Sequence, residues 1–577
     1  MAETPPEKRV RHLIILRRFA QLAKAFFLQE KRRETRVFGV ILLCLCGVVG
    51  LVQLLVSYAG RNFITSLTQR DAAGFYRNLW IYLATFALAI PVGVLYRYSA
   101  ERLALLWRQW MTHILVNRFF FNRAYYRLSH SDRVDNPDQR ISEDVRSFTT
   151  GVLGYMLTAI NSGVTLCAFT GVLFTISWKL PVVLMCYACV GTFLSIFIGK
   201  RLVGLHFQQY QKEANFRYAL VRVRDNAESI AFFRGEKREH RDLMGRFGKV
   251  VNNTLLIIGW NRTLGFFTNS YNYIALIVPL LVVGPMFMRG AIEYGVVTQA
   301  EGAFAQVLMA LSVIVAQFEG LSGFAAAIKR LGDLWDELDE YDIEDANAER
   351  ETELAVNEGA KRLSLNDLTV RTPDRGKILT RGLSFTLPPG KSVLIMGESG
   401  SGKSSLLRTI AGIWKSGKGT IERPNINHLI FLPQRPYMLQ GNLRAQLAYP
   451  QNEEGADDQL IKEALKKVNL TEVLDRVDGD LGRVEDWTNM LSLGEQQRVS
   501  FARIFLRKPQ IAFLDEATSA LDEPNEELLY KNLLKLGISF VSVGHRSTLK
   551  PYHDFLIVLS KDGGVEISEL DKGNPIE

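Results

Sequence analysis

The sequence predicts a membrane α-helical domain with six transmembrane helices, followed by an α/β domain that contains a phosphate-binding loop. Six apolar runs lie in the first 330 residues, and each is near the ~20 residues that a bilayer core requires. From about residue 361, short β-rich runs alternate with helical ones, which is typical of a largely parallel sheet. The stretch GESGSGKS follows one of these β-rich runs and fits the phosphate-loop pattern in full. At 577 residues, the chain is also too long for a single core.

The six predicted spans define the expected domain organisation. They cover residues 37–59, 79–99, 151–177, 180–199, 268–288 and 303–324. The last span contains Gln306, Gln317 and Glu319, and polar residues in a span usually face a bundle interior or a water-filled cavity. We expect four parts in chain order: a basic arm (1–36), a transmembrane domain (37–330), an acidic linker (331–360) and a nucleotide-binding domain (361–577).

The net charge of +9 is explained by basic residues beside the membrane spans rather than by a nucleic-acid partner. Those in the N-terminal arm are Lys8, Arg9, Arg11, Arg17, Arg18, Lys24, Lys31, Arg32, Arg33 and Arg36. Basic residues beside a span mark the cytoplasmic side, which places the arm, the long connections 100–150 and 200–253, and the C-terminal domain in the cytoplasm. The sequence has neither an aromatic-basic platform nor zinc-finger spacing, so no nucleic acid is expected.

Both long connections are expected to contain helices that extend the spans. In the first of them, Asn136 is predicted to cap a helix that begins at Pro137, with Gln139 completing a capping box. A well-defined helix start is the simpler interpretation of this stretch. A coupling element that docks on the C-terminal domain is the functional one, and both can hold together.

The phosphate loop lies between a strand, SVLIMG, and a helix. Its candidate nucleotide-binding residues are Gly397, Glu398, Ser399, Gly400, Ser401, Gly402, Lys403, Ser404 and Ser405. The glycines let the backbone curl round phosphate oxygens, Lys403 is expected to reach the β and γ phosphates, and Ser404 is expected to bind Mg²⁺. The loop in this strand–loop–helix setting predicts ATP and Mg²⁺ as cofactors.

Acidic residues follow a second buried strand, in IAFLDEATSALD. Asp515 is expected to hold Mg²⁺ through water or Ser404, and Glu516 to orient and deprotonate the attacking water. The alternative, a surface acid pair that caps a helix, is disfavoured by the phosphate loop. His545 closes a further β-like run, ISFVSVGH. A lone histidine is more often structural, but strand ends gather round the nucleotide in such sheets, so His545 is expected to sense the γ-phosphate.

A second phosphate-binding site is predicted about ninety residues beyond the phosphate loop. In LSLGEQQRVSFAR, Ser492, Leu493 and Gly494 form the N-terminal end of a helix that begins with Glu495. A helix N-terminus points backbone N–H groups outward and binds phosphate readily. Two phosphate-binding sites so far apart in one sequence require an explanation.

The order of the motifs supplies one. The phosphate loop, Gln434 in FLPQRPYM, LSLGE, the acidic strand end, SALD and His545 follow one another in an order that resembles the ABC ATPase family. Those domains work as head-to-tail dimers, in which the LSLGE helix of one subunit covers the ATP held by the other. The resemblance implies that Ser492, Gly494 and Glu495 bind the partner's nucleotide. It also implies that Gln434 acts both with the catalytic residues and at Mg²⁺.

One departure from the ABC ATPase pattern concerns adenine. These domains usually place an aromatic residue upstream of the phosphate loop, by position near Thr372 in TVRTPDRGKIL, and no aromatic residue stands there. The group that stacks on adenine is therefore left open. Because the chain has one such domain with both halves of an ATP site, it is expected to form a homodimer or to pair with a similar half-chain.

The membrane half resembles the subfamily D ABC half-transporters, the peroxisomal type, and their bacterial relatives, with a BacA/SbmA-like membrane domain fused to an ABC ATPase. The resemblance rests on YYRLSHSDRVDNPDQRISEDVRSF (125–148), NAESIAFFRGEKRE (226–239), LRAQLAYP (443–450) and VSVGHRSTLKPYH (541–553). It implies a homodimer of twelve spans in membrane lipid, joined through its nucleotide-binding domains and transmembrane helices. Such a dimer moves a solute by alternating access.

Three functions are compatible with this resemblance. The expected one is ATP-driven transport of a bulky hydrophilic or amphipathic solute, such as peptides or cobalamin, across a bacterial inner membrane with the nucleotide-binding domain in the cytoplasm. The alternative is a fatty-acid or acyl-CoA transporter, in which Arg97, Arg102 and Arg108 hold anionic head groups or, equally, face lipid phosphates. The remote alternative is a membrane-anchored regulatory ATPase. Import and export share these motifs, so direction does not follow.

Overall fold

The computed structural model describes residues 18, 20–22, 24, 26, 33–131, 133–316, 318–351, 353–372, 376–453 and 457–570. The chain divides into two compact units, residues 1–343 and 344–577, which are described separately here. Six of the ten predicted basic positions of the arm lie outside the described residues: Lys8, Arg9, Arg11, Arg17, Lys31 and Arg32.

The first unit is helical, and the prediction of six spans is confirmed. Among the described residues, six helices are long and apolar enough to cross a membrane. The six spans lie in α2 (Arg33–Thr68), α3 (Ala72–Phe120), α6 (Val145–Ile176), α7 (Lys179–Asp225), α9 (Glu236–Met288) and α10 (Tyr294–Ala316). A further long helix, α11 (Phe318–Glu351), follows them. The predicted connections 100–150 and 200–253 are largely helical extensions of the spans, as expected from the sequence.

The sixth span begins earlier than its polar residues suggest. Helix α10 starts at Tyr294 rather than near residue 303. Within this added part, Gln299 is buried and donates a hydrogen bond from Nε2 to Ser57 Oγ of α2 at 3.3 Å. The predicted polar position Gln317 lies outside the described residues.

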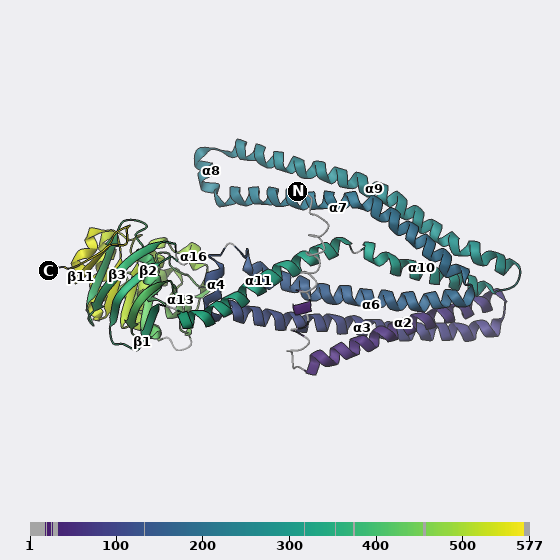
Figure 1. Ribbon diagram of the computed structural model, residues 1–577, viewed down its shortest axis with the longest axis horizontal. Helices are drawn as coiled ribbons and strands as arrows, with labels where there is room; N and C mark the ends of the chain where they lie inside the picture. Colours follow the sequence, from purple (N-terminus) through teal and green to yellow (C-terminus); the bar gives the residue numbers. More distant parts are fainter. Residues whose placement is uncertain are drawn as a thin grey trace. The chain divides into compact units, whose positions relative to one another are not determined.

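Helices α7 and α9 form a long antiparallel pair, with α8 (Ala227–Phe233) at the turn between them (Figure 1). Gly191 allows the two helices to approach closely, because a Cβ atom there would lie 2.3 Å from the ring of Tyr271. The rings of Tyr187 and Tyr271 stack with centroids 4.4 Å apart. The pair is therefore joined tightly at its membrane end.

The connection between α3 and α6 bends twice, and its predicted cap is wrong. A 3-10 turn (Phe121–Arg123), α4 (Ala124–Leu128), α5 (Pro137–Gln139) and a π-helical turn (Arg140–Asp144) follow one another. The helix begins at Pro137, but Asn136 has φ 42° and its side chain makes no capping hydrogen bond. Instead, the buried Arg140 donates to the carbonyls of Asp135 (2.8 Å) and Arg330 (2.7 Å) and so fixes the segment from outside the helix.

The residues predicted as an acidic linker are helical up to Glu351, within α11. One face of α11 packs Leu331, Leu334 and Leu338 into the core of the first unit. Its acidic residues pair with arginines from three other segments. The pairs are Arg18 with Asp333 (2.7 Å) and Asp336 (2.7 Å), Arg118 with Asp339 (2.5 Å) and Asp342 (2.8 Å), and Arg133 with Glu340 (2.8 Å).

The second unit is an α/β domain with two main sheets, which confirms the predicted fold class. One sheet has the order β1-β5-β2-β3, with β1 (Leu354–Glu358), β5 (Gly417–Arg423), β2 (Leu363–Arg371) and β3 (Ile378–Leu387). The other has the order β12-β11-β4-β10-β9-β6, with β12 (Val565–Glu569), β11 (Phe555–Leu559), β4 (Ser392–Gly397), β10 (Ser539–Val543), β9 (Ile511–Asp515) and β6 (Leu429–Leu432). All its neighbouring strands are parallel except the β11–β12 pair.

Besides two 3-10 helices (Ile426–His428 and Ser547–Tyr552), the remaining elements of the second unit among the described residues are one small two-stranded ladder and seven α-helices. They are β7 (Gly441–Asn442), β8 (Val484–Glu485), α12 (Lys403–Ile410), α13 (Leu443–Ala448), α14 (Asp458–Lys467), α15 (Glu472–Arg476), α16 (Trp487–Met490), α17 (Leu493–Arg507) and α18 (Glu523–Leu536). Helix α17 begins within the LSLGE motif.

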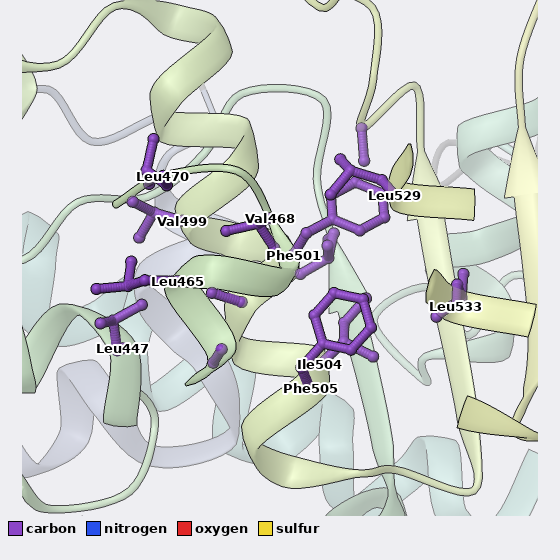
Figure 2. Packing of buried hydrophobic residues seen from close by; sticks show 14 of the residues in the cluster. Leu447, Leu465, Val468, Leu470, Val499, Phe501, Ile504, Phe505, Leu529 and Leu533 are labelled. Atoms are coloured by element: carbon purple, nitrogen blue, oxygen red, sulfur yellow. The ribbon is translucent and has the colours of Figure 1, made fainter. Parts of the chain in front are cut away.

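Helix α17 is held by a large apolar cluster (Figure 2). Phe501, Ile504 and Phe505 project from it toward Leu465 on one side and Leu533 of α18 on the other. The cluster fixes the axis of α17, and with it the direction in which the first turn of the helix presents its N–H groups.

We expect Ile504→Val to lower the stability of the second unit modestly. The change removes one buried methylene and costs about 1 kcal/mol, which lowers the melting temperature by roughly 2–4 °C in a domain of this size. Differential scanning fluorimetry of the purified chain measures it. Leu528→Val, at a partly exposed position of α18, is the control and should leave the melting temperature unchanged. Equal shifts in both variants would contradict the packing described here.

Candidate nucleotide-binding and hydrolysis site

The phosphate loop connects β4 to α12 through two positions that only glycine suits. Gly397 has φ 149°, and a Cβ atom there would lie 2.3 Å from the carbonyl oxygen of Leu559. Gly402 has φ 95°, and its added Cβ would lie 2.9 Å from Leu379 Cβ. Both backbone conformations are ones that residues with a Cβ rarely adopt. The loop therefore curls tightly and leaves its interior to phosphate oxygens.

The side chain of Lys403 bonds to the backbone of this loop. The residue is 6% exposed, and its Nζ donates to the carbonyls of Gly397 (2.8 Å) and Glu398 (2.9 Å). Burial lowers the pKa of Lys403, against the opposing effect of the nearby Glu516 and Asp515 charges. The Ser401 hydroxyl is also buried, and no described residue is its hydrogen-bond partner. A buried ammonium, an unpaired hydroxyl and a glycine-lined curl are a donor set that fits a triphosphate.

The other predicted loop residues lie round this interior. Ser399 and Gly400 are exposed at the tip of the loop, and Ser405 is half-buried in the first turn of α12. Glu398 is exposed and pairs with Lys561 at 2.7 Å, and this contact lowers the pKa of the Glu398 carboxyl.

Ser404 and Asp515 come together from two parts of the chain. Ser404 Oγ donates to Asp515 Oδ1 at 3.0 Å. Burial raises the pKa of the Asp515 carboxyl, although the hydrogen bond from Ser404 acts in the opposite direction. A hydroxyl and a carboxylate so close together are hard oxygen ligands of the kind that Mg²⁺ takes beside a phosphate, so the pair fits this ion.

Glu516 is held between Gln434 and His545. Gln434 Nε2 donates to Glu516 Oε2 at 2.7 Å, and His545 Nε2 lies 3.0 Å from Glu516 Oε1. The three residues follow the carboxyl ends of β6, β9 and β10, which are neighbours in one sheet. Glu516 has φ 49°, an uncommon value for a residue with a side chain, and strained positions of this kind cluster at functional sites.

Ser492 and Glu495 build the start of α17 together. Glu495 N donates to Ser492 Oγ (3.3 Å), and Ser492 N donates to Glu495 Oε2 (2.8 Å), which is a capping box. Burial alone raises the pKa of Glu495, but hydrogen bonds from Arg476 and Ser492 outweigh it and lower the pKa. Ser492 is exposed, whereas the Glu495 carboxylate serves the helix start itself. A Cβ on Gly494 would lie 3.1 Å from Ala520 O.

One residue of this site is missing from the sequence-based prediction. Gln497 is buried on α17, donates to Ser519 Oγ (3.2 Å) and accepts from Ala520 N (3.1 Å). It therefore ties the LSLGE helix to the SALD segment. Helical spacing from Leu493 places Gln497 on the same face as the motif, and this spacing was the available signal.

Thr372, near the position where ABC ATPase domains usually carry an aromatic residue for adenine, lies in the loop between β2 and β3. Thr372 N donates to Lys377 O at 2.9 Å and closes this loop. Residues 373–375 of the predicted adenine-side segment lie outside the described residues.

Known families match both halves of the chain. The family described as ABC transporter transmembrane region 2 matches residues 22–288, and the ABC transporter family matches residues 380–519. An uncharacterised ABC transporter ATP-binding protein of Synechocystis sp. is 43% identical over 94% of this chain and 83% of its own length. The chloroplastic ABC transporter D family member 2 of Arabidopsis thaliana is 38% identical, over 96% and 87%.

A relative with a named solute also aligns along nearly its whole length. The human lysosomal cobalamin transporter ABCD4 is 30% identical over 97% of this chain and 97% of its own. The six membrane-crossing helices, the α/β domain with its phosphate loop and these full-length relatives agree with one another. The chain belongs to the ABC transporters, in the subfamily D group of half-transporters and their bacterial relatives.

Proposed function

We propose that this chain is an ATP-driven half-transporter that works as a homodimer and moves a bulky hydrophilic or amphipathic solute, such as a peptide or cobalamin. The observation that carries the proposal is the position of Glu516, which lies between Gln434 and His545 at the end of the strand that also bears Asp515. A carboxylate in this place, next to a fitted phosphate loop, is suited to orient and deprotonate an attacking water.

The residues of the site divide the work of hydrolysis. Lys403 and the loop N–H groups bind the phosphates of ATP, which supplies the γ-phosphoryl group. Ser404 and Asp515 would hold Mg²⁺, which would supply positive charge beside the phosphoryl oxygens. Glu516 takes the proton of the water, His545 fixes the Glu516 carboxylate, and Gln434 holds its other oxygen.

Helix α17, which begins within the LSLGE motif, supports a composite site across two copies of the chain. The exposed Ser492 and the half-buried Gly494 stand at the N-terminus of a fifteen-residue helix, whose dipole favours an anion. In a head-to-tail dimer, this end closes over the partner's nucleotide.

The α7–α9 pair supports a dimer of the membrane units. Helix α7 has 47 residues, more than twice the ~20 that a bilayer core requires. Beyond the predicted span, it exposes Phe207 (72%) and Tyr218 (71%). Exposed aromatic side chains beyond a span are suited to cover by protein, and we assign that cover to the second copy.

The choice of solute rests on the relatives. The human relative transports cobalamin by its name. Peptides are included because the sequence of the membrane half resembles BacA/SbmA-like domains. With the basic segments on the cytoplasmic side, we place the second unit in the cytoplasm and the protein in a bacterial inner membrane.

A second candidate function, transport of a fatty acid or acyl-CoA, is favoured by one groove. It has a volume of about 300 Å³ and a mostly apolar lining from α3 and α6, which includes Leu105, Leu153 and Leu157. Arg108 and Glu101 stand in its lining, and the Glu101 carboxylate is paired with Arg97 at 2.8 Å. An apolar groove beside a cation suits an acyl chain with an anionic head.

We expect one class of solute to stimulate ATP hydrolysis by the chain in lipid nanodiscs, in a panel of peptides, cobalamin and acyl-CoA. Stimulation by peptides or cobalamin, followed by uptake into vesicles, supports the main proposal. Stimulation by acyl-CoA that is lost in Arg108→Ala and kept in Arg97→Ala supports the second. Hydrolysis indifferent to every compound, in vesicles that move none of them, would contradict both and support a regulatory ATPase.

A further inference from the structure

A buried carboxylate is hydrogen-bonded to the two segments that follow the proposed catalytic residues. Glu526, in the first turns of α18, is 2% exposed. Its Oε2 accepts a hydrogen bond from Thr518 Oγ1 at 2.8 Å, and its Oε1 accepts one from Thr548 Oγ1 at 2.9 Å. The two threonines belong to separate segments, one after β9 and the other after β10.

Arg546 extends this network to the backbone of the SALD segment. Its Nη1 lies 3.4 Å from Glu526 Oε2 and donates to Leu521 O at 3.1 Å. Its Nη2 donates to Ser519 O at 3.1 Å. The guanidinium therefore spans the turn that follows Glu516, while its own backbone directly follows His545.

The network joins the two segments that carry the proposed catalytic pair. Thr518 lies just beyond Glu516 in sequence, and Arg546 is the neighbour of His545. Glu516 and His545 must stay 3.0 Å apart for their contact to form. A charge buried this deeply is unfavourable unless hydrogen bonds satisfy it, and here its donors come from just these two segments.

A role in starting α18 does not explain these contacts. Acidic side chains are favourable near a helix N-terminus, and Glu523 in the same first turn meets that need. The hydrogen bonds of Glu526 described here instead go to side chains of other segments.

We propose that Glu526 is a positioning residue for ATP hydrolysis, which holds the Glu516 segment and the His545 segment in register through Thr518, Thr548 and Arg546. The inference rests on the proposed roles of Glu516 and His545. It adds a residue that touches neither nucleotide nor water and acts only through the geometry of those that do.

The test compares Glu526→Gln with Glu527→Gln in the full-length chain in nanodiscs. Glu527 is the next residue of α18, is half exposed and pairs with Lys531 of the same helix at 2.6 Å. We expect Glu526→Gln to lower kcat per nucleotide-loaded site about 10-fold and to leave the KM for ATP within about twofold. Glu527→Gln should change neither quantity.

A conservative pair of variants separates positioning from simple stability. Thr518→Ser keeps the hydroxyl donor and should keep kcat, whereas Thr518→Val keeps the shape, loses the donor and should lower kcat as Glu526→Gln does. These two variants also carry the test if Glu526→Gln does not fold. An unchanged kcat in Thr518→Val, or a loss of ATP affinity with kcat retained, would overturn the inference.

The result is separable from the outcome for the proposed function. If Glu516→Gln hydrolyses ATP as wild type does, the proposed chemistry fails whatever Glu526 does. If Glu516→Gln is inactive while Glu526→Gln and Thr518→Val are normal, only the positioning role fails.

Discussion

Glu516→Gln is expected to lower ATP hydrolysis by about 10²–10⁴-fold, the range attributed to a lost general base. The amide keeps the shape of the side chain, and it can still accept from Gln434 or meet His545, but it cannot take a proton from water. The residues that bind the triphosphate, Lys403 and Ser404, are untouched. ATP binding should therefore persist, and the dimer closed over ATP should accumulate because hydrolysis no longer releases it.

The measurements are phosphate release and the binding of a fluorescent ATP analogue in nanodiscs. Glu566→Gln, an exposed carboxylate on β12, is the matched control and should behave as wild type. Hydrolysis by Glu516→Gln at the normal rate would remove Glu516 from the mechanism. Loss of ATP binding together with hydrolysis would show that the variant damages the phosphate loop instead.

Gly494→Asp is expected to lower hydrolysis by about 10²–10³-fold, comparable to the loss of a key donor to developing charge. The new side chain lies at the N-terminus of α17, where its Cβ already meets Ala520 O at 3.1 Å. Its negative charge repels the γ-phosphate that this helix end is proposed to cover. Because the variant's own phosphate loop is intact, ATP binding to the isolated subunit should remain near normal.

Mixed dimers make this prediction decisive. When Gly494→Asp is combined with Lys403→Ala in separate subunits, one composite site loses both halves and the other keeps both, so the mixture should regain hydrolysis above either variant alone. Leu460→Asp, which adds the same charge at an exposed position of α14, is the control and should stay active. Absence of any recovery in the mixed dimer would contradict a site shared between subunits.

Features encoded in contiguous residues could be predicted from the sequence. The six spans follow from runs of apolar residues, and the loop that contains Lys403 follows from its glycine spacing. The contacts of Glu516 with Gln434 and His545 could not be derived from spacing, because they depend on β6, β9 and β10 being neighbours in one sheet. The order of the motifs indicated that these three residues belong to one site only because that order resembles a known family.

The prediction from sequence was wrong where contacts with distant residues, rather than local helix-capping preferences, determine the structure. Asn136 has the residue type of a helix cap, but Arg140 and its bond to Arg330 O hold that turn instead. The same holds for Glu526, which local pattern alone presents as one more acidic residue at a helix start. Its proposed positioning role depends on the hydrogen bonds that it accepts from Thr518 and Thr548, and only the folded chain brings these residues together.

The pairing of Arg18 with α11 has a consequence for the order of events during synthesis. Arg18 and Asp333 are 315 positions apart, so at about 5–20 residues per second the arginine waits roughly 15–60 s for its partner. Throughout that time Arg18 lacks the aspartates of α11, and this is the period in which basic residues fix the orientation of the first span. Once α11 is made, its aspartates pair with the same charge. We therefore expect Arg18 to serve first as an orientation signal for insertion and afterwards as a structural ion pair.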